Sequence, residues 1–260
     1  MIKIYLEIAL ISLLMVSSHA SAWGPQGHRI SARIAEELLS ETAKTAINDL
    51  LAGQSFAEAA FWADEMRSNP ADFWQNQAGA YHYVTVPKGK TYREVGAPAQ
   101  GDGVTALSGF RRDLRDKAAS RAHKQLALRF SLHIIQDLHQ PLHVGNGTDR
   151  GGTRYRVQFL GKNTNLHRVW DTDLILQAGL REGEWVSRLQ ARLTPEVLAQ
   201  PCSDSPEPWI AESATLRDAI YPPSNRIDAD YVRRQLPEIE ERLLQSAIRV
   251  ACYFNKLYEK

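Results

Sequence analysis

The sequence predicts a mainly α-helical, single-domain protein that follows an N-terminal signal peptide. Apolar residues recur at three- and four-residue spacings through much of the chain beyond residue 28, a pattern typical of helices that bury one face. The stretch 124–139 is apolar on nearly every side, which indicates a helix buried in the core. No internal repeat, low-complexity run or Gly/Ser linker divides the chain, so we expect one domain over residues 23–260.

The predicted helices begin near His28, where Ile30, Ile34 and Leu38 share one stripe. The central helix ends before Pro141, because the residue preceding a proline is displaced from helical geometry. The further predicted helical segments are 57–67, 124–139, 166–180, 184–193, 207–220 and 229–258, and Pro237 marks a kink or a break in the last of them. Loops are expected at 87–104 and 145–153. A short strand pair of 83–86 with 154–159 is compatible with the sequence but not required by it.

The N-terminus has the pattern of a secretory signal peptide, residues 1–22. Lys3 precedes an apolar stretch at 4–16, and the small residues Ala-Ser-Ala occupy 20–22. The apolar run is shorter than the roughly 20 residues that span a bilayer, which argues against an anchor. A buried N-terminal helix is the alternative. Cleavage after Ala22 makes Trp23 the first residue of an exported, periplasmic or extracellular protein.

Charge and cysteine content narrow the function classes further. A formal net charge of +1 argues against a module that binds duplex nucleic acid by broad phosphate neutralisation. A polyanionic substrate would need local cations instead, and metal ions are candidates. The two cysteines, Cys202 and Cys252, are too few for a zinc finger. In an exported protein they favour a disulfide, worth about 4 kcal/mol on the chain-entropy model, over two separately buried thiols.

Histidine and aspartate recur together in apolar settings. On the predicted buried helix, His133 and Asp137 are four residues apart and hence on one face, and His143 follows the helix end. A buried carboxylate needs a partner or a metal ion. The same spacing recurs at His167 and Asp171; further candidates in apolar or aromatic surroundings are Asp64, His82 and, near the start of the mature chain, His28.

Imidazole and carboxylate groups are the usual ligands of zinc in proteins. A single buried His–Asp pair would more often be a structural hydrogen bond than a metal site. Several such units in one chain reverse that preference, and the sequence therefore predicts a metal centre.

Five segments resemble the metal-binding motifs of the zinc-dependent single-strand nucleases of the S1/P1 family. They occur in the family's order and extend over nearly the whole mature chain. The segments are Trp23-Gly24 with Gly27-His28, Trp62-Ala63-Asp64, Tyr81-His82-Tyr83-Val84, the run from His133 to Gly145, and the run from Asn165 to Thr172. The stretches at Trp209–Ser213 and Tyr221-Pro222 are also similar to the C-terminal part of that family.

The resemblance implies a helical fold of the phospholipase C and single-strand nuclease type with three Zn²⁺ ions in a cleft. The first ion would be held by Asp64, His82, His133 and Asp137; the second by His143, His167 and Asp171; and the third by the amine and carbonyl of Trp23, by His28 and by the other oxygen of Asp137.

The same resemblance implies an endonuclease that hydrolyses single-stranded DNA and RNA to 5′-phosphorylated products and also acts on 3′-nucleotides. Hydroxide generated between two zinc ions would attack phosphorus in line, and the third ion would stabilise the leaving 3′-oxygen. Asp64 and Arg67 are the implied catalytic side chains. Arg67, on the same predicted helix face as Asp64, corresponds to the phosphate-stabilising arginine; the alternative is an ordinary surface arginine.

Two positions concern recognition of the base. Tyr83 stands where the family places a stacking aromatic, whereas Thr85 stands where fungal members carry an acidic residue, so base preference is expected to be weak.

Other departures from the family pattern favour a bacterial branch: the loop 96–104 lacks the cysteines of many plant and fungal members, and Thr153 replaces the usual asparagine. We expect a structural role for His139, a solvated His123, and a loop without glycan at the sequon Asn146.

Two other functions compete with this interpretation. Zinc-dependent phospholipase C resembles the family in fold and in its N-terminal tryptophan, but its last ligand pair ends in glutamate where this chain has Asp171. A non-catalytic, exported zinc- or nucleic-acid-binding protein is the other alternative, and the full ligand set together with Arg67 argues against it. Neither a stable protein partner nor a membrane anchor is implied.

Overall fold

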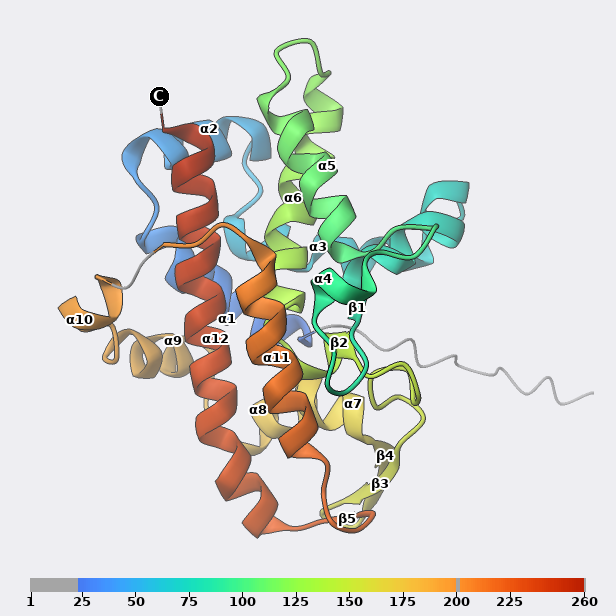
Figure 1. Cartoon of the computed structure of the whole chain (residues 1–260). Coiled ribbons are helices and arrows are strands. Elements are labelled where there is room, and N and C mark those ends of the chain that lie inside the picture. Colours follow the sequence, from blue (N-terminus) through green and yellow to red (C-terminus); the bar gives the residue numbers. More distant parts are fainter. Residues whose placement is uncertain (1–22, 200–201, 260) are drawn as a thin grey trace, which may run out of the picture.

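The computed structural model describes residues 23–199 and 202–259, and the chain over these ranges is mainly helical, as predicted (Figure 1). The predicted signal peptide, residues 1–22, lies outside the described residues. The longer helices are α1 (Pro25–Glu37), α2 (Glu41–Leu51), α3 (Phe56–Glu65), α5 (Gly103–Arg115), α6 (Arg121–Asp137), α9 (Glu182–Gln190), α11 (Pro206–Ile220) and α12 (Ala229–Tyr258). Short helical turns are η1 (Met66–Ser68), η2 (Phe73–Gln77), η3 (Ala78–His82), α4 (Tyr92–Val95), η4 (Pro141–His143), α7 (Leu166–Arg168), η5 (Val169–Asp173), α8 (Leu174–Gln177) and α10 (Pro195–Leu198).

Helix α6 is the central element of the core. It packs against α5, α3 and α12, and every residue from Phe130 to Asp137 is buried. The helix begins three residues earlier than predicted, because the Ser120 hydroxyl accepts a hydrogen bond from the backbone of His123 and caps the first turn. The predicted apolar helix is thus confirmed, and His133 and Asp137 lie deep inside the molecule.

Helix α12 lies beside α1 and α11 (Figure 1). Arg242 on α12 donates hydrogen bonds to Glu212 and Ser213 on α11. Of the kink or break predicted at Pro237, the break is wrong, because one helix runs without interruption from Ala229 to Tyr258. Pro237 is exposed, so the carbonyl group that it leaves without a helical hydrogen bond can be hydrated. Cys252, on this helix, forms a disulfide with Cys202, which settles the choice between a disulfide and two thiols.

The predicted strand pair is wrong in its partners. Strand β1 (Val84–Thr85) pairs in parallel with β2 (Val144–Gly145). Strand β3 (Arg156–Phe159) pairs with β4 (Lys162–Asn165) and with β5 (Arg226–Ile227). Such short strands carry little sequence signal for a partner, since pairing is set by the surrounding helices.

Two of the longer helices, α2 and α5, were not predicted. Both are amphipathic and capped, by the side chains of Ser40 and Asp102 respectively. The predicted loop 87–104 also contains the short helix α4. None of the helices within residues 23–199 and 202–259 has the length and the hydropathy of a membrane-spanning segment.

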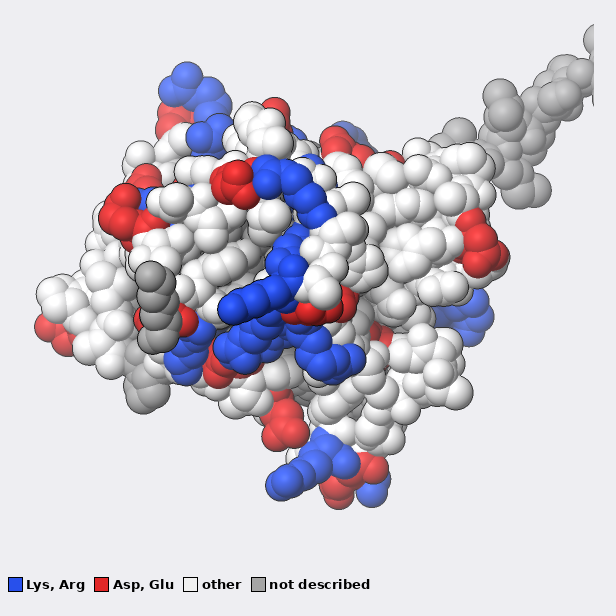
Figure 2. Space-filling model, turned by 90° about the horizontal axis from the view of Figure 1, so that it is seen from above, with Lys and Arg blue, Asp and Glu red and all other residues white. Residues whose placement is uncertain are grey.

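Lysine and arginine side chains form a band on the face seen from above (Figure 2). Acidic side chains lie beside this band, so the face carries both signs of charge. Ion pairs join Arg111 and Lys256 to the same carboxylate, Asp204, at 2.5 and 3.5 Å. This distribution agrees with a chain whose net charge is close to zero.

Candidate metal centre

Eight His and Asp side chains from several elements converge in the interior. They form three groups in which the potential ligand atoms lie within 4.8 Å of one another, and every member is buried. The groups are His28, His133 and Asp137; Asp64, His82 and His133; and His143, His167 and Asp171. Each of these residues was a candidate in the sequence, and the structure brings all of them together.

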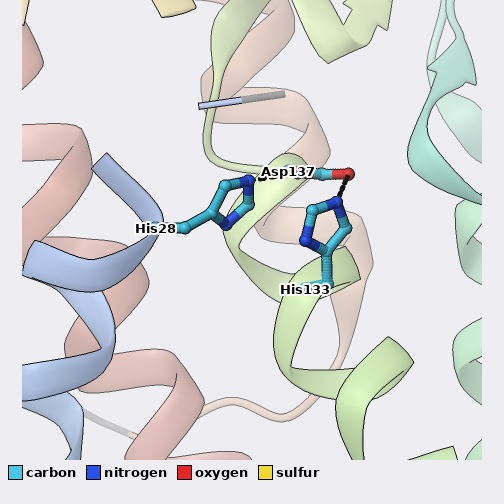
Figure 3. A group of neighbouring side chains, drawn as sticks. All are labelled: His28, His133 and Asp137. Atoms are coloured by element: carbon cyan, nitrogen blue, oxygen red, sulfur yellow. Dashed lines mark ion pairs between the residues drawn. The ribbon is translucent and has the colours of Figure 1, made fainter. Parts of the chain in front are cut away.

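Asp137 lies between two groups. Its Oδ1 is 3.4 Å from Nε2 of His28, and its Oδ2 is 3.1 Å from Nε2 of His133 (Figure 3). The rings of these two histidines stack with their centroids 4.2 Å apart. Nδ1 of His82 is also 3.1 Å from Oδ2. The two carboxylate oxygens thus face different sets of nitrogen atoms, so each oxygen belongs to a different cluster of potential ligand atoms.

The third group is built by the segment after α6 and by the α7–η5 turn. His167 and Asp171 are four residues apart across that turn, and Nε2 of His167 is 3.0 Å from Oδ2 of Asp171. The rings of His143 and His167 have centroids 5.0 Å apart. The amide of Gln140 donates to the other oxygen, Oδ1 of Asp171. Asp171 therefore has one oxygen held by the protein and one directed toward His167.

Oxygen acceptors fix the orientation of four histidine rings. Because an amide or carbonyl oxygen can only accept, Nδ1 of each ring carries the proton and Nε2 keeps its lone pair. The acceptors are Gln136 Oε1 for His28 at 2.6 Å, Ala60 O for His133 at 2.7 Å, His82 O for His143 at 2.6 Å, and Gly151 O for His167 at 2.6 Å. In His82 it is Nδ1 that faces the other ligand atoms, 2.9 Å from Nε2 of His133.

The donor set fits metal cations. Nε2 of His28, Nε2 of His143 and Oδ1 of Asp137 are buried and make no hydrogen bond to the described part of the chain. Burial raises the pKa of Asp137 to about 7 and that of Asp171 to about 6. Burial also lowers the pKa values of His28, His82 and His143 well below the usual range, which keeps these rings neutral. Cations bound here would satisfy the open lone pairs and offset the cost of burying carboxylates.

The start of the described chain is fixed next to this centre. The Trp23 side chain is fully buried, and its indole nitrogen donates to the carbonyl oxygen of Gln136 at 3.0 Å. The Gln136 amide in turn donates to the carbonyl oxygen of His28 at 3.1 Å. Gln136 precedes Asp137, so it links residues 23 and 28 to the segment that carries this carboxylate.

The predicted substrate contacts lie at the mouth of the centre. Nε of Arg67 is 2.7 Å from Oδ1 of Asp64. Arg67, Tyr83 and Thr85 line one cavity of about 570 Å³ together with the metal-group residues His82 and His143. Tyr83 is 45% exposed, so its ring is available for stacking.

Three residues set aside in the sequence lie outside the three groups. His139 is fully buried; its Nδ1 donates to the carbonyl of Ile135 and its Nε2 accepts from Arg249, as expected for a structural role. His123 is largely exposed beside Asp113. The oxygen of the Asn146 side chain accepts two hydrogen bonds from Thr148.

Sequence reasoning missed several residues around the centre. Gln136 at the end of α6 and Gln140 in the turn that follows orient candidate ligands, and an amide side chain at these positions gave no distinctive signal. Arg217, buried on α11, donates to the carbonyl oxygens of Val86 and Val144, at 2.7 Å each, and so supports the β1–β2 pair. Arg150 and Arg154 line the same cavity as Arg67. Two arginines flanking the Gly151-Gly152 turn after His143 could have been singled out.

A family model described as S1/P1 Nuclease matches residues 23–259 of this chain. The chain belongs to the S1/P1 nuclease family. It is therefore a nuclease, a hydrolase of phosphodiester bonds, and the resemblance inferred from the motifs is confirmed. The family is metal-dependent, and the three His/Asp groups are positions at which this chain could hold its ions.

Relatives are similar over most of their length. Endonuclease 4 of Arabidopsis thaliana is 30% identical over 283 residues, which cover 95% of this chain and 92% of that protein. Endonuclease 2 of the same plant is 25% identical, with coverage of 99% and 98%. Nuclease S1 of Aspergillus oryzae is 25% identical, with coverage of 90% and 91%.

Proposed function

We propose that this chain is an exported, zinc-dependent endonuclease that cleaves single-stranded DNA and RNA to 5′-phosphorylated products and also removes phosphate from 3′-nucleotides. The observation that carries the proposal is the convergence of buried, oriented imidazole and carboxylate groups beside an open cavity. The match to the nuclease family over residues 23–259 supports the choice of a phosphodiester substrate.

Zinc suits the donor set because it prefers imidazole and carboxylate ligands and tolerates an open position. We assign one ion to Asp64, His82, His133 and Asp137, and a second to His143, His167 and Asp171. A third would use His28, Oδ1 of Asp137, and the amine and carbonyl of Trp23. The buried indole of Trp23 and the Gln136 hydrogen bonds support this last assignment, because they hold the chain start beside Asp137. When bound, the zinc ions would supply Lewis acidity and hydroxide at neutral pH.

The protein side chains position and stabilise the substrate. Arg67 has its Nε against Asp64, which orients the guanidinium toward the cavity mouth where it can contact a phosphate oxygen. Tyr83 offers an exposed ring on which any base can stack. Thr85 offers no carboxylate to read a base edge, so base selectivity is weak. The buried carbonyl–histidine hydrogen bonds keep the ligand geometry fixed during turnover.

The direct test incubates zinc-loaded protein beginning at Trp23 with single-stranded DNA, RNA, a 3′-nucleotide and a phosphocholine ester. We expect 5′-phosphorylated oligonucleotides and free phosphate from the first three substrates, and no product from the ester. Removal of zinc should abolish turnover and lower the melting temperature, because clustered ligands then lose their cation. Cleavage of the phosphocholine ester alone would establish a phospholipase instead. Full activity after verified zinc removal would refute the metal mechanism.

Export and the third ion are tested together. In a precursor the Trp23 nitrogen is an amide, which is a poor zinc ligand, so removal of residues 1–22 should complete the site. We compare protein beginning at Trp23 with protein carrying one additional N-terminal alanine. The extended form should bind about one zinc ion fewer and lose most of its activity on single-stranded DNA. Equal zinc content and activity in both forms would show that the N-terminus is not a ligand.

A further inference from the structure

Two arginines beside the metal centre have no role in the ligand set. Arg150 and Arg154 are exposed and line the cavity of about 570 Å³ that also contains Arg67, Tyr83 and Thr85. Neither guanidinium forms an ion pair with a residue in the ranges 23–199 and 202–259. No aspartate or glutamate lines this cavity. The band in Figure 2, by contrast, has acidic side chains beside it.

The loop that carries these arginines is held in a fixed shape. The Asp149 carboxylate accepts hydrogen bonds from the backbone of Gly152 at 2.9 Å and from the hydroxyl of Tyr221 at 2.7 Å. Arg150 has a φ of 56°, a left-handed conformation that costs a non-glycine residue free energy and often marks functional positions. The loop therefore presents Arg150 from a braced backbone rather than from a mobile one.

The same loop contacts both a metal-group residue, His167, and Thr85 beside the exposed ring of Tyr83. The carbonyl of Gly151 accepts from Nδ1 of His167 at 2.6 Å, and a Cβ atom on Gly147 would lie only 3.4 Å from Thr85. The arginines thus lie in one cavity with the exposed ring of Tyr83 and with His143. The cavity size is within the range of about 300–1,000 Å³ that is typical of ligand sites.

We propose that Arg150 and Arg154 bind the phosphate of a nucleotide that flanks the scissile bond, so that they select a polynucleotide chain over an isolated phosphodiester. This inference rests on the proposed nuclease function. Guanidinium groups suit phosphate oxygens because their donors match two oxygens at once. Their contribution is one of substrate binding, and we expect it to appear in KM and in salt dependence rather than in the chemical step.

The test compares wild-type protein with the Arg150→Gln/Arg154→Gln variant and with the matched control Arg226→Gln. Arg226 is exposed on β5 and does not line this cavity. Steady-state kinetics are measured with a single-stranded decanucleotide and with bis(4-nitrophenyl) phosphate, which has no flanking phosphate. We expect kcat/KM for the decanucleotide to fall about tenfold more than for the small diester, mainly through KM. The slope of log(kcat/KM) against log salt should become shallower by about 1.4, or about 0.7 for each contact.

A binding measurement separates this proposal from the nuclease proposal. Fluorescence anisotropy with a phosphorothioate single strand, checked to remain intact, reports affinity whether or not the protein cleaves. Weaker binding by the double variant, together with recovery in Arg150→Lys/Arg154→Lys, would support the arginine site even if no hydrolysis occurred. Equal binding by wild-type and double-variant protein would overturn it. Equal losses on both kinetic substrates, with lowered zinc content, would also overturn it, because they would show damage to the His167 loop instead.

Discussion

Gly151 packs against the backbone of Leu142 and the ring of His167, so its substitution tests how two candidate ligands of the third group, His143 and His167, are held. Its φ is 58°, and a Cβ atom added there would lie 2.2 Å from the carbonyl oxygen of Leu142, the residue before His143. Its own carbonyl orients the ring of His167. We expect Gly151→Ala to displace His143 and His167 relative to each other and to weaken metal binding by this group.

The magnitude follows from two costs. A left-handed alanine costs about 1–2 kcal/mol, and a clash with backbone in a packed region costs about 1–3 kcal/mol more. Gly151→Ala should therefore lower the free energy of unfolding by about 2–5 kcal/mol. Gly161→Ala is the matched control, since Gly161 has a φ of 89° and nothing lies within 4 Å of an added Cβ atom. It should cost only about 1–2 kcal/mol.

The assay is urea unfolding of both variants, combined with zinc quantification and hydrolysis of single-stranded DNA. Gly151→Ala should lose about one zinc ion and most activity, whereas Gly161→Ala should keep both. Equal stability of the two variants, with full zinc content in Gly151→Ala, would refute the role assigned to this close approach.

Three further predictions follow from the site. His133→Ala and Asp137→Asn should each abolish turnover and lower zinc content, whereas His123→Ala, on an exposed face, should keep most activity; equal losses with intact circular dichroism spectra would contradict the assignment. Burial raises the pKa of Asp137 to about 7, so protons should compete with zinc for this carboxylate below that pH. The apparent affinity for zinc, measured by chelator competition, should fall by up to about tenfold per pH unit between about pH 7 and 5. A zinc affinity that does not change with pH would count against this carboxylate as a ligand. Tyr83→Ala should weaken binding of a single-stranded oligonucleotide by about 1–3 kcal/mol and Thr85→Ala by less, with little preference among homopolymers; a strong preference for one base would argue for a direct reading of the base edge.

Much of the candidate site could be predicted because its pairs are local. His133 with Asp137, and His167 with Asp171, are each four residues apart, and this spacing alone places both members on one side of a helical turn. The apolar surroundings of Asp137 indicated burial, and burial of a carboxylate indicated a cation. The motif order then predicted the family, which the match over residues 23–259 confirms.

The partners of short elements could not be predicted. Residues 83–86 and 154–159 have strand character, but the structure pairs them with β2, β4 and β5 rather than with each other. The register of a two-residue strand depends on what the surrounding helices leave open, and Arg217 from α11 holds β1 and β2 together from outside.

The sequence by itself determined the helical class, the buried central helix and the identity of the metal-binding candidates, because these depend on periodicity and on residue chemistry over a few neighbouring positions. Local spacing did not encode that His28, Asp64 and His82 meet the central helix, or that Asp137 directs its two oxygens to different groups. The family resemblance implied both relations, and the tertiary structure shows them. Only the tertiary structure decided that Arg150 and Arg154 share a cavity with Tyr83. These relations depend on contacts between distant segments, which the packing of α1, α3 and α6 creates and which no local spacing encodes.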